Sequence, residues 1–265
     1  MSTTPRHQFL SDYRVIRHAE GRGSDDPAYY LALPFEDLTG RNSAQWAMRG
    51  KSYRYFERQI LPEFERQAAG RPLNILDLGS GNGWMSYRLT LRGHQPIAVD
   101  IFSDARDGLR AARHYPRKFP LLEAEYDHLP FPANRFDLAI YNSSFHYSTN
   151  YQRSLSEVRR CLRADGAVII MDSPVYARRE HGLKMVAERH EQFQQQYGFR
   201  SDAMPSLEFL DEPMIVELAR DLQIEWRVSR PWYGWAWHLR PVKARLARRR
   251  PPSRFWILAG KFVNR

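Results

Sequence analysis

A glycine-rich turn and one acidic residue carry the clearest chemical signal in this 265-residue chain. The turn, DLGSGNG at residues 77–83, follows an apolar run and leads directly into a helical pattern. Glycines let the backbone turn tightly and let a ligand approach the main chain, and a helix N-terminus offers unpaired N–H groups. Asp100 ends the next apolar run, 19 residues beyond Gly81, where a carboxylate can accept hydrogen bonds from ribose hydroxyls. The pattern predicts a nucleoside-binding site.

The residues around the glycines distinguish between the nucleoside ligands that such a turn could bind. A dinucleotide fingerprint needs its third glycine where this chain has Trp84, and an indole there would crowd a pyrophosphate. Asp77 would repel a phosphate, but it suits the ammonium group of a nucleoside that carries an amino acid. No Lys-Ser or Lys-Thr pair follows the glycines, which excludes a Walker loop. An NAD-linked oxidoreductase of the Rossmann type remains the alternative enzyme class.

On these residues the chain resembles the class I S-adenosylmethionine (SAM)-dependent methyltransferases of the small-molecule type. Asp77 and the three glycines match the first motif of that family, and Asp100 matches its ribose-binding acid. Residues 125–138 resemble the loop that contacts adenine, and residues 156–167 resemble the connection into the fifth strand. The resemblance covers residues 70–175. It implies SAM as the cofactor and S-adenosylhomocysteine as its product.

The resemblance also implies roles for individual residues around the cofactor. Gly79 and Gly81 would line the methionyl part, and Asp77 would order its amino group. Glu125 and the Tyr126 backbone would face adenine, although relatives usually have Asp-Ala at these two positions. The strand end near Asn142 would lie beside the sulfonium. The implied cofactor-binding residues are Asp77, Gly79, Ser80, Gly81, Gly83, Asp100, Ile101, Glu125, Tyr126 and Asn142.

Two side chains that follow later strands are candidates for moving a proton. Positioning the nucleophile supplies much of the acceleration in methyl transfer, and an oxygen or nitrogen acceptor can also need a base. His146 follows the fourth strand and Asp172 the fifth, at the carboxyl edge where such sheets bind ligands. The alternative is a purely structural role: a hydrogen bond within the packing for His146, and a cap on local backbone for Asp172. Arg49 is a candidate partner for the SAM carboxylate, against a solvated arginine.

A sheet must bring these strand ends together. Short apolar runs alternate with amphipathic stretches at βαβ spacing and lack in/out alternation, as strands covered on both faces require. We therefore predict an α/β fold with a doubly wound, Rossmann-like, mostly parallel seven-stranded sheet and helices on both faces. The predicted strands are residues 74–78, 96–99, 121–126, 136–141, 167–171, 224–233 and 255–262. The predicted helices include residues 83–91, 104–115 and 151–163, a helix of about 20 residues stopped by Gly198, and one starting at 211–213.

Residues 1–70 are expected to precede the SAM-binding domain, residues 71–265, as an N-terminal segment and a cap helix. Residues 1–40 suggest irregular structure, because glycines and prolines interrupt them. From about residue 43 to 67, apolar residues recur at helical intervals, and Pro62 should break or kink this helix. Trp46 and Tyr53 would either cover the cofactor or pack on the sheet.

Positive charge is concentrated at the end of the chain. The net charge is +10, yet residues 240–265 contain nine Lys and Arg residues and no acid, so the other 239 residues carry +1. We treat residues 240–254 as a basic insertion. Lys243–Arg254 could face solvent, hold an anionic substrate or contact an anionic surface. Nucleic acid is not an expected partner, because no RNA-binding module is evident. A non-catalytic module that binds anions through this stretch is the third functional alternative.

Composition sets the broad class. A chain with 43% hydrophobic and 26% charged residues is typical of a globular protein, and no apolar run or signal-peptide pattern indicates a membrane or secreted protein. Because Cys161 is the single cysteine, we expect no intramolecular disulfide, no metal site and a cytoplasmic location. Residues 232–237 hold four aromatics whose alternation favours a strand, either in packing or in a substrate wall. We predict a SAM-dependent methyltransferase whose acceptor, reacting atom (O, N or C) and oligomeric state stay open; a secondary metabolite or lipid-like compound is one class of acceptor.

Overall fold

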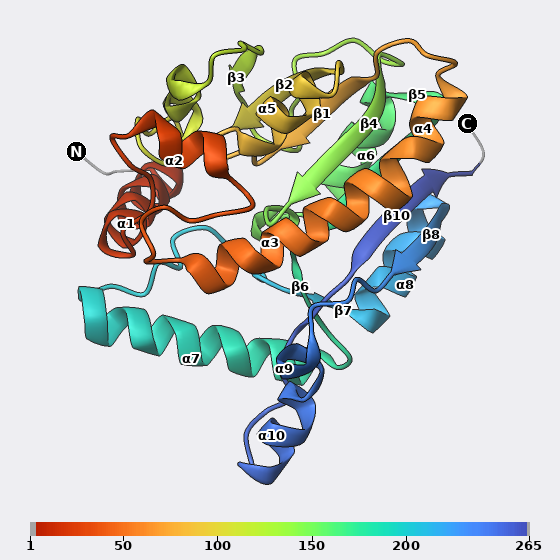
Figure 1. The fold of residues 1–265 in the computed structure, drawn as a ribbon. Helices are drawn as coiled ribbons and strands as arrows, with labels where there is room; N and C mark the ends of the chain where they lie inside the picture. The colour runs from red at the N-terminus through yellow and green to blue at the C-terminus, as the bar shows by residue number, and fades with distance from the viewer. Residues whose placement is uncertain (1–3, 264–265) are drawn as a thin grey trace.

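The computed structural model describes residues 4–263 and contains a seven-stranded sheet with helices on both faces (Figure 1). The strand order is β3-β2-β1-β4-β5-β10-β8. Strand β10 runs antiparallel to β5 and β8, and the other neighbouring strands are parallel. This confirms the predicted mostly parallel α/β fold. The strands are β1 (Asn74–Leu78), β2 (Gln95–Asp100), β3 (Leu121–Glu123), β4 (Phe136–Asn142), β5 (Leu162–Met171), β8 (Ile224–Ser229) and β10 (Ile257–Phe262).

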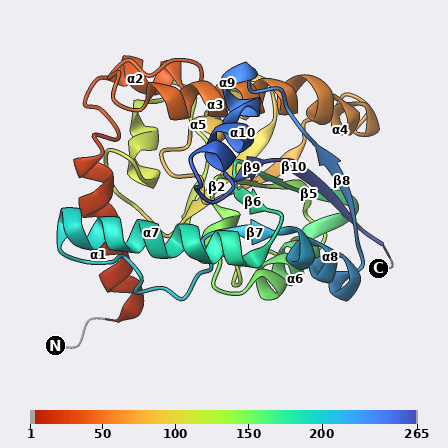
Figure 2. The same ribbon diagram turned by 90° about the horizontal axis from the view of Figure 1, so that it is seen from below.

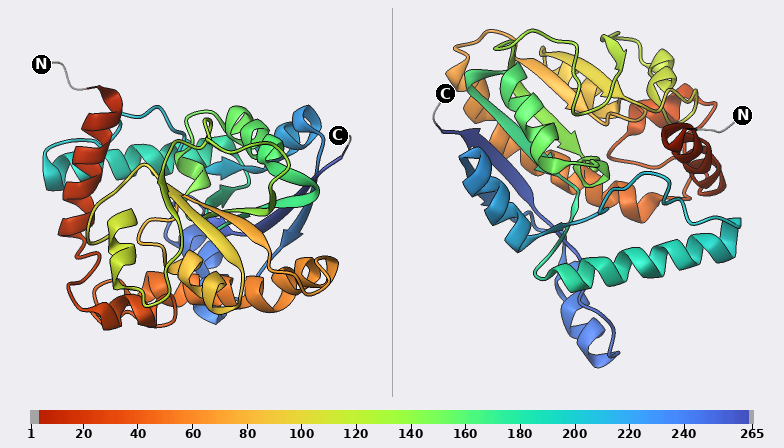
Figure 3. Two further views of the ribbon diagram at one scale, coloured as in Figure 1. Left: turned by 90° about the horizontal axis from the view of Figure 1, so that it is seen from above. Right: turned by 180° about the vertical axis from the view of Figure 1, so that it is seen from behind.

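Alternate side chains of the central strands enter two separate cores. Leu138 and Ile140 of β4 pack into one core, whereas Ala139 and Tyr141 pack into the other. Because both faces are buried, these strands read as continuous apolar runs. Figure 3 shows α6 and α8 on one face of the sheet, opposite α3 and α4. The covering helices are α3 (Ser43–Tyr55), α4 (Leu61–Gln67) and α5 (Trp84–Leu91) on the first core, and α6 (Tyr151–Cys161) and α8 (Glu212–Leu222) on the second.

The prediction of an irregular segment over residues 1–40 is wrong for the residues that the structure describes. Residues Pro5–Ala19 form α1 and Pro27–Ala32 form α2. Each helix begins with a proline behind a capping side chain, Thr4 for α1 and Asp26 for α2. Proline fits the first helical position because the N–H that it lacks would have no intrahelical partner. The same residue type that suggested interruption therefore starts both helices.

The predicted helix over residues 43–67 is present and is distorted next to Pro62. A π-helical turn, η1 (Phe56–Ile60), joins α3 to α4, and Pro62 is the second residue of α4. The extra residue in a π turn lets the chain stay helical where proline removes a hydrogen bond. Trp46 and Tyr53 of α3 are buried against Trp84 of α5. Both pack in the first core, and Trp46 also lines the pocket beside the glycine turn.

Two other predictions fail locally. Only a 3-10 helix, η2 (Leu109–His114), forms within residues 104–115. Strand β8 ends at Ser229, and the aromatic segment forms α9 (Trp235–His238) instead of a strand. The remaining elements are α7 (Arg179–Tyr197), α10 (Arg240–Leu246) and a three-stranded sheet of β7 (Leu210–Asp211), β6 (Pro174–Tyr176) and β9 (Arg254–Phe255).

The basic stretch projects from the body. Helix α10 extends away from the sheet in both Figure 1 and the right panel of Figure 3, and Figure 2 shows it end-on between α7 and α3. Arg265, one of the nine basic residues, lies outside the described residues. No described helix has both the length and the apolar character required to cross a membrane.

Candidate active site

The three glycines of the turn after β1 adopt backbone conformations that disfavour a side chain. Gly79, Gly81 and Gly83 have φ angles of 70°, 54° and 79°, which L-residues with a Cβ rarely adopt. A Cβ on Gly79 would lie 2.3 Å from Ser144 Cβ and 2.4 Å from Tyr126 Oη. Gly83 caps the N-terminus of α5. The main chain is therefore exposed at the edge of a pocket that this turn lines.

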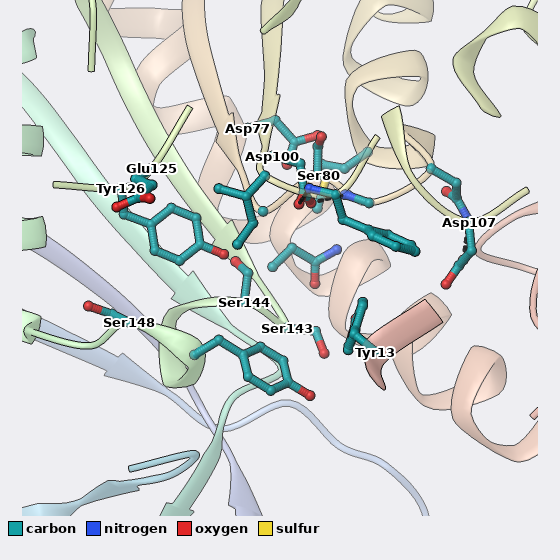
Figure 4. Close-up of a pocket in the computed structure, with 18 of the residues that line it drawn as sticks. Tyr13, Asp77, Ser80, Asp100, Asp107, Glu125, Tyr126, Ser143, Ser144 and Ser148 are labelled. Carbon is teal, nitrogen blue, oxygen red and sulfur yellow. Dashed lines mark hydrogen bonds between the residues drawn. The ribbon is translucent and has the colours of Figure 1, made fainter. Parts of the chain in front are cut away.

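Asp100 ends β2 and faces the same turn (Figure 4). Its Oδ2 accepts a hydrogen bond from Gly81 N at 2.7 Å, and its Oδ1 accepts one from Phe102 N at 2.8 Å. Burial raises the pKa of Asp100 to about 6. Because a carboxylate has about four acceptor positions, Asp100 can still accept hydrogen bonds from two hydroxyls. Ile101, the next residue, also lines the pocket.

Four buried polar atoms from the lining of this pocket have no hydrogen-bond partner among residues 4–263: Trp46 Nε1, Asp77 Oδ1, Ser80 Oγ and Asn142 Oδ1. The other oxygen of Asp77 accepts hydrogen bonds from the backbone and hydroxyl of Ser86, at 3.1 and 2.7 Å. Burial raises the pKa of Asp77 to about 7. Since buried polar groups are normally hydrogen-bonded, these atoms fit a polar ligand, and Asp77 fits a cationic group. The donor set therefore suits a nucleoside that carries an amino acid.

Glu125 and Tyr126 lie on the opposite side of the pocket (Figure 4). The Glu125 carboxylate is half exposed and pairs with Arg6 of α1 at 3.2 Å. The Tyr126 ring is edge-on to Tyr141, and its hydroxyl approaches Gly79. Burial raises the pKa of Tyr126 well above its ordinary value. Tyr126 thus contributes its side chain to the pocket, which the sequence did not indicate.

Helix α1 supplies a wall that sequence reasoning missed. Phe9, Tyr13 and Arg17 line the pocket at four-residue intervals. Arg17 Nε donates to Asp107 Oδ2 at 2.5 Å, and Tyr13 packs edge-on against Phe102. The four-residue spacing was visible in the sequence, but the charged Arg17 made this face of the helix look solvent-exposed. Asp107, 90 residues away, neutralises Arg17, so the arginine side chain can lie in the wall with only 15% of its surface exposed.

Arg49 of α3 also lies at this pocket. Its guanidinium stacks on Trp46 and donates to Ser143 Oγ at 3.1 Å. Within residues 4–263, no carboxylate lies within 4.0 Å of it. Burial, with the nearby Arg22 and Arg17, lowers the pKa of Arg49 to about 10. An anion would complete this environment.

A second cavity of about 740 Å³ adjoins the first pocket. Its walls come from α1, α3, α7, the residues after β4 and β5, and the α9–β9 region. This volume is in the range of small-molecule sites. The residues that line both the pocket and the cavity are Phe9, Tyr13, Arg17, Arg49, Ser143 and Tyr147.

His146 lies in a 3-10 turn, η3 (Phe145–Tyr147), and lines the second cavity. Its Nδ1 is 3.1 Å from Ser173 Oγ. Burial, followed by repulsion from Arg189 and Arg49, lowers the pKa of His146 to about 3. The imidazole is therefore neutral at pH 7, and its conjugate acid is too strong to hold a proton there.

Asp172 follows β5 and lines the same cavity. Its Oδ1 accepts from Ser52 Oγ at 2.5 Å, and Ser52 is 2.9 Å from the Tyr233 hydroxyl. Its Oδ2 is buried and has no hydrogen-bond partner among the described residues. Burial raises the pKa of Asp172 to about 6. The φ of Asp172 is 54°, in the left-handed region, and such strain is often found at functional sites.

Comparison with known proteins identifies the domain that carries the first pocket. Residues 76–170 match a family model described as a methyltransferase domain. Over 163 residues the chain is 35% identical to a malonyl-[acyl-carrier protein] O-methyltransferase of Geobacter sulfurreducens, covering 59% of this chain and 52% of that one. It is 30% identical over 108 residues to 2-methyl-6-phytyl-1,4-hydroquinone methyltransferase 2 of rice, covering 40% and 30%. The chain thus spans about half the length of these relatives or less.

A solved structure supports the fold. The S-adenosylmethionine-dependent methyltransferase of Mesorhizobium loti superposes with a TM-score of 0.54 at 18% identity, covering 84% of this chain and 99% of that one. Neither the oxidoreductase alternative nor the non-catalytic alternative finds support in these comparisons. Residues 76–170 therefore carry a methyltransferase domain, and the chain around it has the fold of the class I SAM-dependent methyltransferases.

Proposed function

We propose that the protein transfers the methyl group of SAM to a small molecule held in the second cavity. The continuity of this cavity with the glycine-turn pocket carries the proposal, because six residues line both. SAM, when bound, supplies an electrophilic methyl group on a sulfonium. The protein's contribution is to hold cofactor and acceptor side by side at attack geometry, which accounts for much of the acceleration in such reactions.

The cofactor residues follow from the pocket's unsatisfied groups. Asp100 would accept hydrogen bonds from the ribose hydroxyls, with Ile101 beside it. Asp77 would bind the ammonium group, and Arg49 the carboxylate. Ser80 and Asn142 would donate to or accept from the methionyl part. The exposed main chain would come from Gly79 and Gly81, and the adenine side from Glu125 and Tyr126. Gly83, which the sequence also suggested, is buried and does not line the pocket.

Asp172 is the better candidate than His146 for a general base. A base works best when its pKa is near the working pH. The pKa of about 6 leaves Asp172 mostly ionised at pH 7 and able to accept a proton. The pKa of about 3 makes His146 a weak base. We infer that His146 shapes the cavity through its contact with Ser173.

Calorimetry with S-adenosylhomocysteine tests cofactor binding. Asp100→Ala removes the ribose acceptor, and hydrogen bonds to charged groups contribute about 1.5–3 kcal/mol, so affinity should fall at least about tenfold. Asp165→Ala, on an exposed acid outside the pocket, serves as the matched control and should bind normally. Wild-type protein that binds neither SAM nor S-adenosylhomocysteine would refute the proposal. If the cofactor binds, radiolabelled methyl transfer into cell extracts would identify the acceptor.

We further propose that the basic segment Lys243–Arg254 contacts an anionic membrane surface. Arg250 and Arg254 pair with Glu188 and Glu212 of the body and anchor the segment. The side chains that point outward combine charge and apolar area: Leu246 is 81% exposed, as suits an interfacial helix. The outward basic residues are Lys243, Arg245, Arg248 and Arg249.

Sedimentation with vesicles tests this surface. The full-length protein should bind vesicles that contain phosphatidylglycerol and not pure phosphatidylcholine vesicles, and salt should weaken the binding. A variant with Arg245, Arg248 and Arg249 changed to Gln should lose most of it. A variant with Arg58, Arg110 and Arg117 changed to Gln lowers the charge equally elsewhere and should bind as wild type. Equal loss in both variants would contradict a localised contact.

A further inference from the structure

The second cavity has aromatic walls. Phe9 and Tyr13 of α1 face it from one side, Phe193 and Tyr197 of α7 from another, and Trp237 and Phe255 come from the α9–β9 region. Such walls bind flat or extended apolar groups well. Specificity in a cavity of this kind comes from a few polar side chains, so its charged residues decide which molecule it accepts.

Most charged residues around the cavity are already paired. Five arginines line it, together with Glu20, Asp172 and Glu208. Three of the arginines have acidic partners, and both glutamates are engaged in these pairs. The pairs are Arg17 with Asp107, Arg22 with Glu20, and Arg189 with Glu208.

The two other arginines differ in their surroundings. Arg49 lies at the junction with the first pocket, and electrostatic attraction links it to Asp172. Arg240 lines the second cavity but not the first. Among the described residues, Arg240 has no carboxylate within 4.0 Å. Arg49 also lacks a carboxylate within 4.0 Å, but Asp172 and Asp107 attract it, whereas no acid among the described residues is an electrostatic partner of Arg240.

Arg240 is held in place without being neutralised. Its guanidinium stacks on the Trp237 ring, and Nη2 donates to Ser253 O at 2.6 Å. Its Nε is buried and has no hydrogen-bond partner in the part of the chain that the structure describes. Burial lowers the pKa of Arg240 to about 10, so it stays charged at pH 7. A partly desolvated cation without an anion is unfavourable, and the guanidinium fork matches a carboxylate or similar oxyanion.

We propose that the acceptor is an organic anion with an aromatic or otherwise apolar body, and that Arg240 binds its anionic group. Calling this anion the acceptor rests on the proposed methyl transfer, whereas the proposed anion-binding site does not. With the anion at Arg240, the body lies along the aromatic walls. The part to be methylated then points toward Arg49, where the cavity meets the cofactor pocket.

A pair of fluorescent probes tests the proposal. 8-Anilinonaphthalene-1-sulfonate is an aromatic anion, and N-phenyl-1-naphthylamine is its uncharged analogue. Titrations of the full-length protein should show tighter binding of the anion. Arg240→Ala should lower the affinity for the anionic probe about tenfold or more, because a charge-assisted hydrogen-bonded pair is lost. The affinity for the uncharged probe should change less than about twofold. Arg240→Lys should retain part of the preference.

Arg245→Ala is the matched control, because Arg245 lies on the same helix and is exposed. It should leave both probes unchanged. Equal weakening by Arg245→Ala would show a diffuse effect of the basic segment, and equal weakening of both probes by Arg240→Ala would show lost packing; either result overturns the proposal. Displacement by 2-naphthoate or by decanoate distinguishes an aromatic from an aliphatic body. Calorimetry with S-adenosylhomocysteine on the same proteins reports separately whether the proposed function fails.

Discussion

Gly79 is the residue at which the cofactor pocket tolerates least change. Its φ of 70° costs an alanine roughly 1–2 kcal/mol, and the new Cβ would meet Ser144 and Tyr126 at 2.3 and 2.4 Å, which adds about 1–3 kcal/mol of overpacking. Gly79→Ala should therefore lower the free energy of unfolding by about 2–5 kcal/mol and abolish S-adenosylhomocysteine binding. Urea denaturation and calorimetry measure the two effects.

Gly93→Ala separates backbone strain from crowding. Gly93 also has a positive φ, 91°, but no atom of the described residues lies within 4 Å of where an added Cβ would be. This variant should lose only about 1–2 kcal/mol of stability and bind the ligand normally. If Gly79→Ala behaves like Gly93→Ala, the turn is merely a tight connection and not part of a binding site.

Asp172 should make stability depend on pH. Its pKa rises from 3.8 to about 6 in the folded state. Below about pH 4 both states are protonated; between about pH 4 and 6 the unfolded state loses the proton first, so ionisation favours unfolding. The penalty is complete above about pH 6 and amounts to roughly 3 kcal/mol, at about 1.4 kcal/mol per pKa unit.

The variant Asp172→Asn cannot ionise and should avoid this penalty. The difference in unfolding free energy between Asp172→Asn and wild type should grow by roughly 3 kcal/mol in favour of the variant from pH 4 to pH 7. Asp165→Asn, on an exposed acid, should show a constant difference. A constant difference for Asp172→Asn as well would mean that Asp172 titrates as an ordinary carboxyl.

At the scale of elements, α1 is held over the pocket by one buried ion pair. The Arg17 side chain is 15% exposed and that of Asp107 is 2% exposed. Removing one member of a buried pair costs about 3–5 kcal/mol, because it leaves the other charge unpaired. Arg17→Gln should therefore release α1, accelerate amide exchange over residues 5–19 and weaken S-adenosylhomocysteine binding.

Arg14→Gln is the control within the same helix. Arg14 is 54% exposed and lies 3.5 Å from Asp104, and pairs of this kind contribute at most about 1 kcal/mol. Amide exchange in α1 should stay close to that of wild type. Unchanged exchange in Arg17→Gln would mean that aromatic packing, and not the ion pair, fixes the helix.

The same helix shows why some elements could be predicted and others could not. Strands β1 and β4 were predictable, because burial on both faces leaves a continuous apolar run in the sequence. Helix α1 buries Asp12 and Arg17, so its inward face does not look apolar. The alternating aromatics of residues 232–237 suggested a strand, yet Tyr233 is buried while Trp235 is 75% exposed, and the segment forms a short helix. Tertiary partners decide these cases.

At the scale of the whole molecule, the cofactor pocket and the acceptor cavity have different origins. The pocket comes largely from one continuous stretch, so a motif and a domain match reveal it. The cavity is assembled from α1, α3, α7 and α9–β9, which no short motif describes. Counting charges placed the excess in the final segment, but only the fold shows that Arg240 faces a cavity while Arg245 and Arg248 face solvent. The predicted cytoplasmic location stays a prediction.

The shared wall predicts coupling between the two ligands. Phe9 of α1 lines both the pocket and the cavity. The first ligand therefore bears the entropic cost of ordering α1, and the second ligand binds without that cost. Saturating S-adenosylhomocysteine should tighten N-phenyl-1-naphthylamine binding about fivefold. Because the probe is uncharged, the charge of Arg49 does not contribute to this coupling.

Two phenylalanine variants locate this coupling. Phe9→Ala should reduce the fivefold ratio toward about one. Phe193, also partly buried, lines only the second cavity, so Phe193→Ala should weaken the probe with and without S-adenosylhomocysteine and leave the ratio unchanged. By linkage, the probe must tighten S-adenosylhomocysteine by the same factor. A ratio of one in the wild-type protein would mean that α1 is equally ordered before either ligand binds, and the two sites would then be neighbours that share a wall without communicating through it.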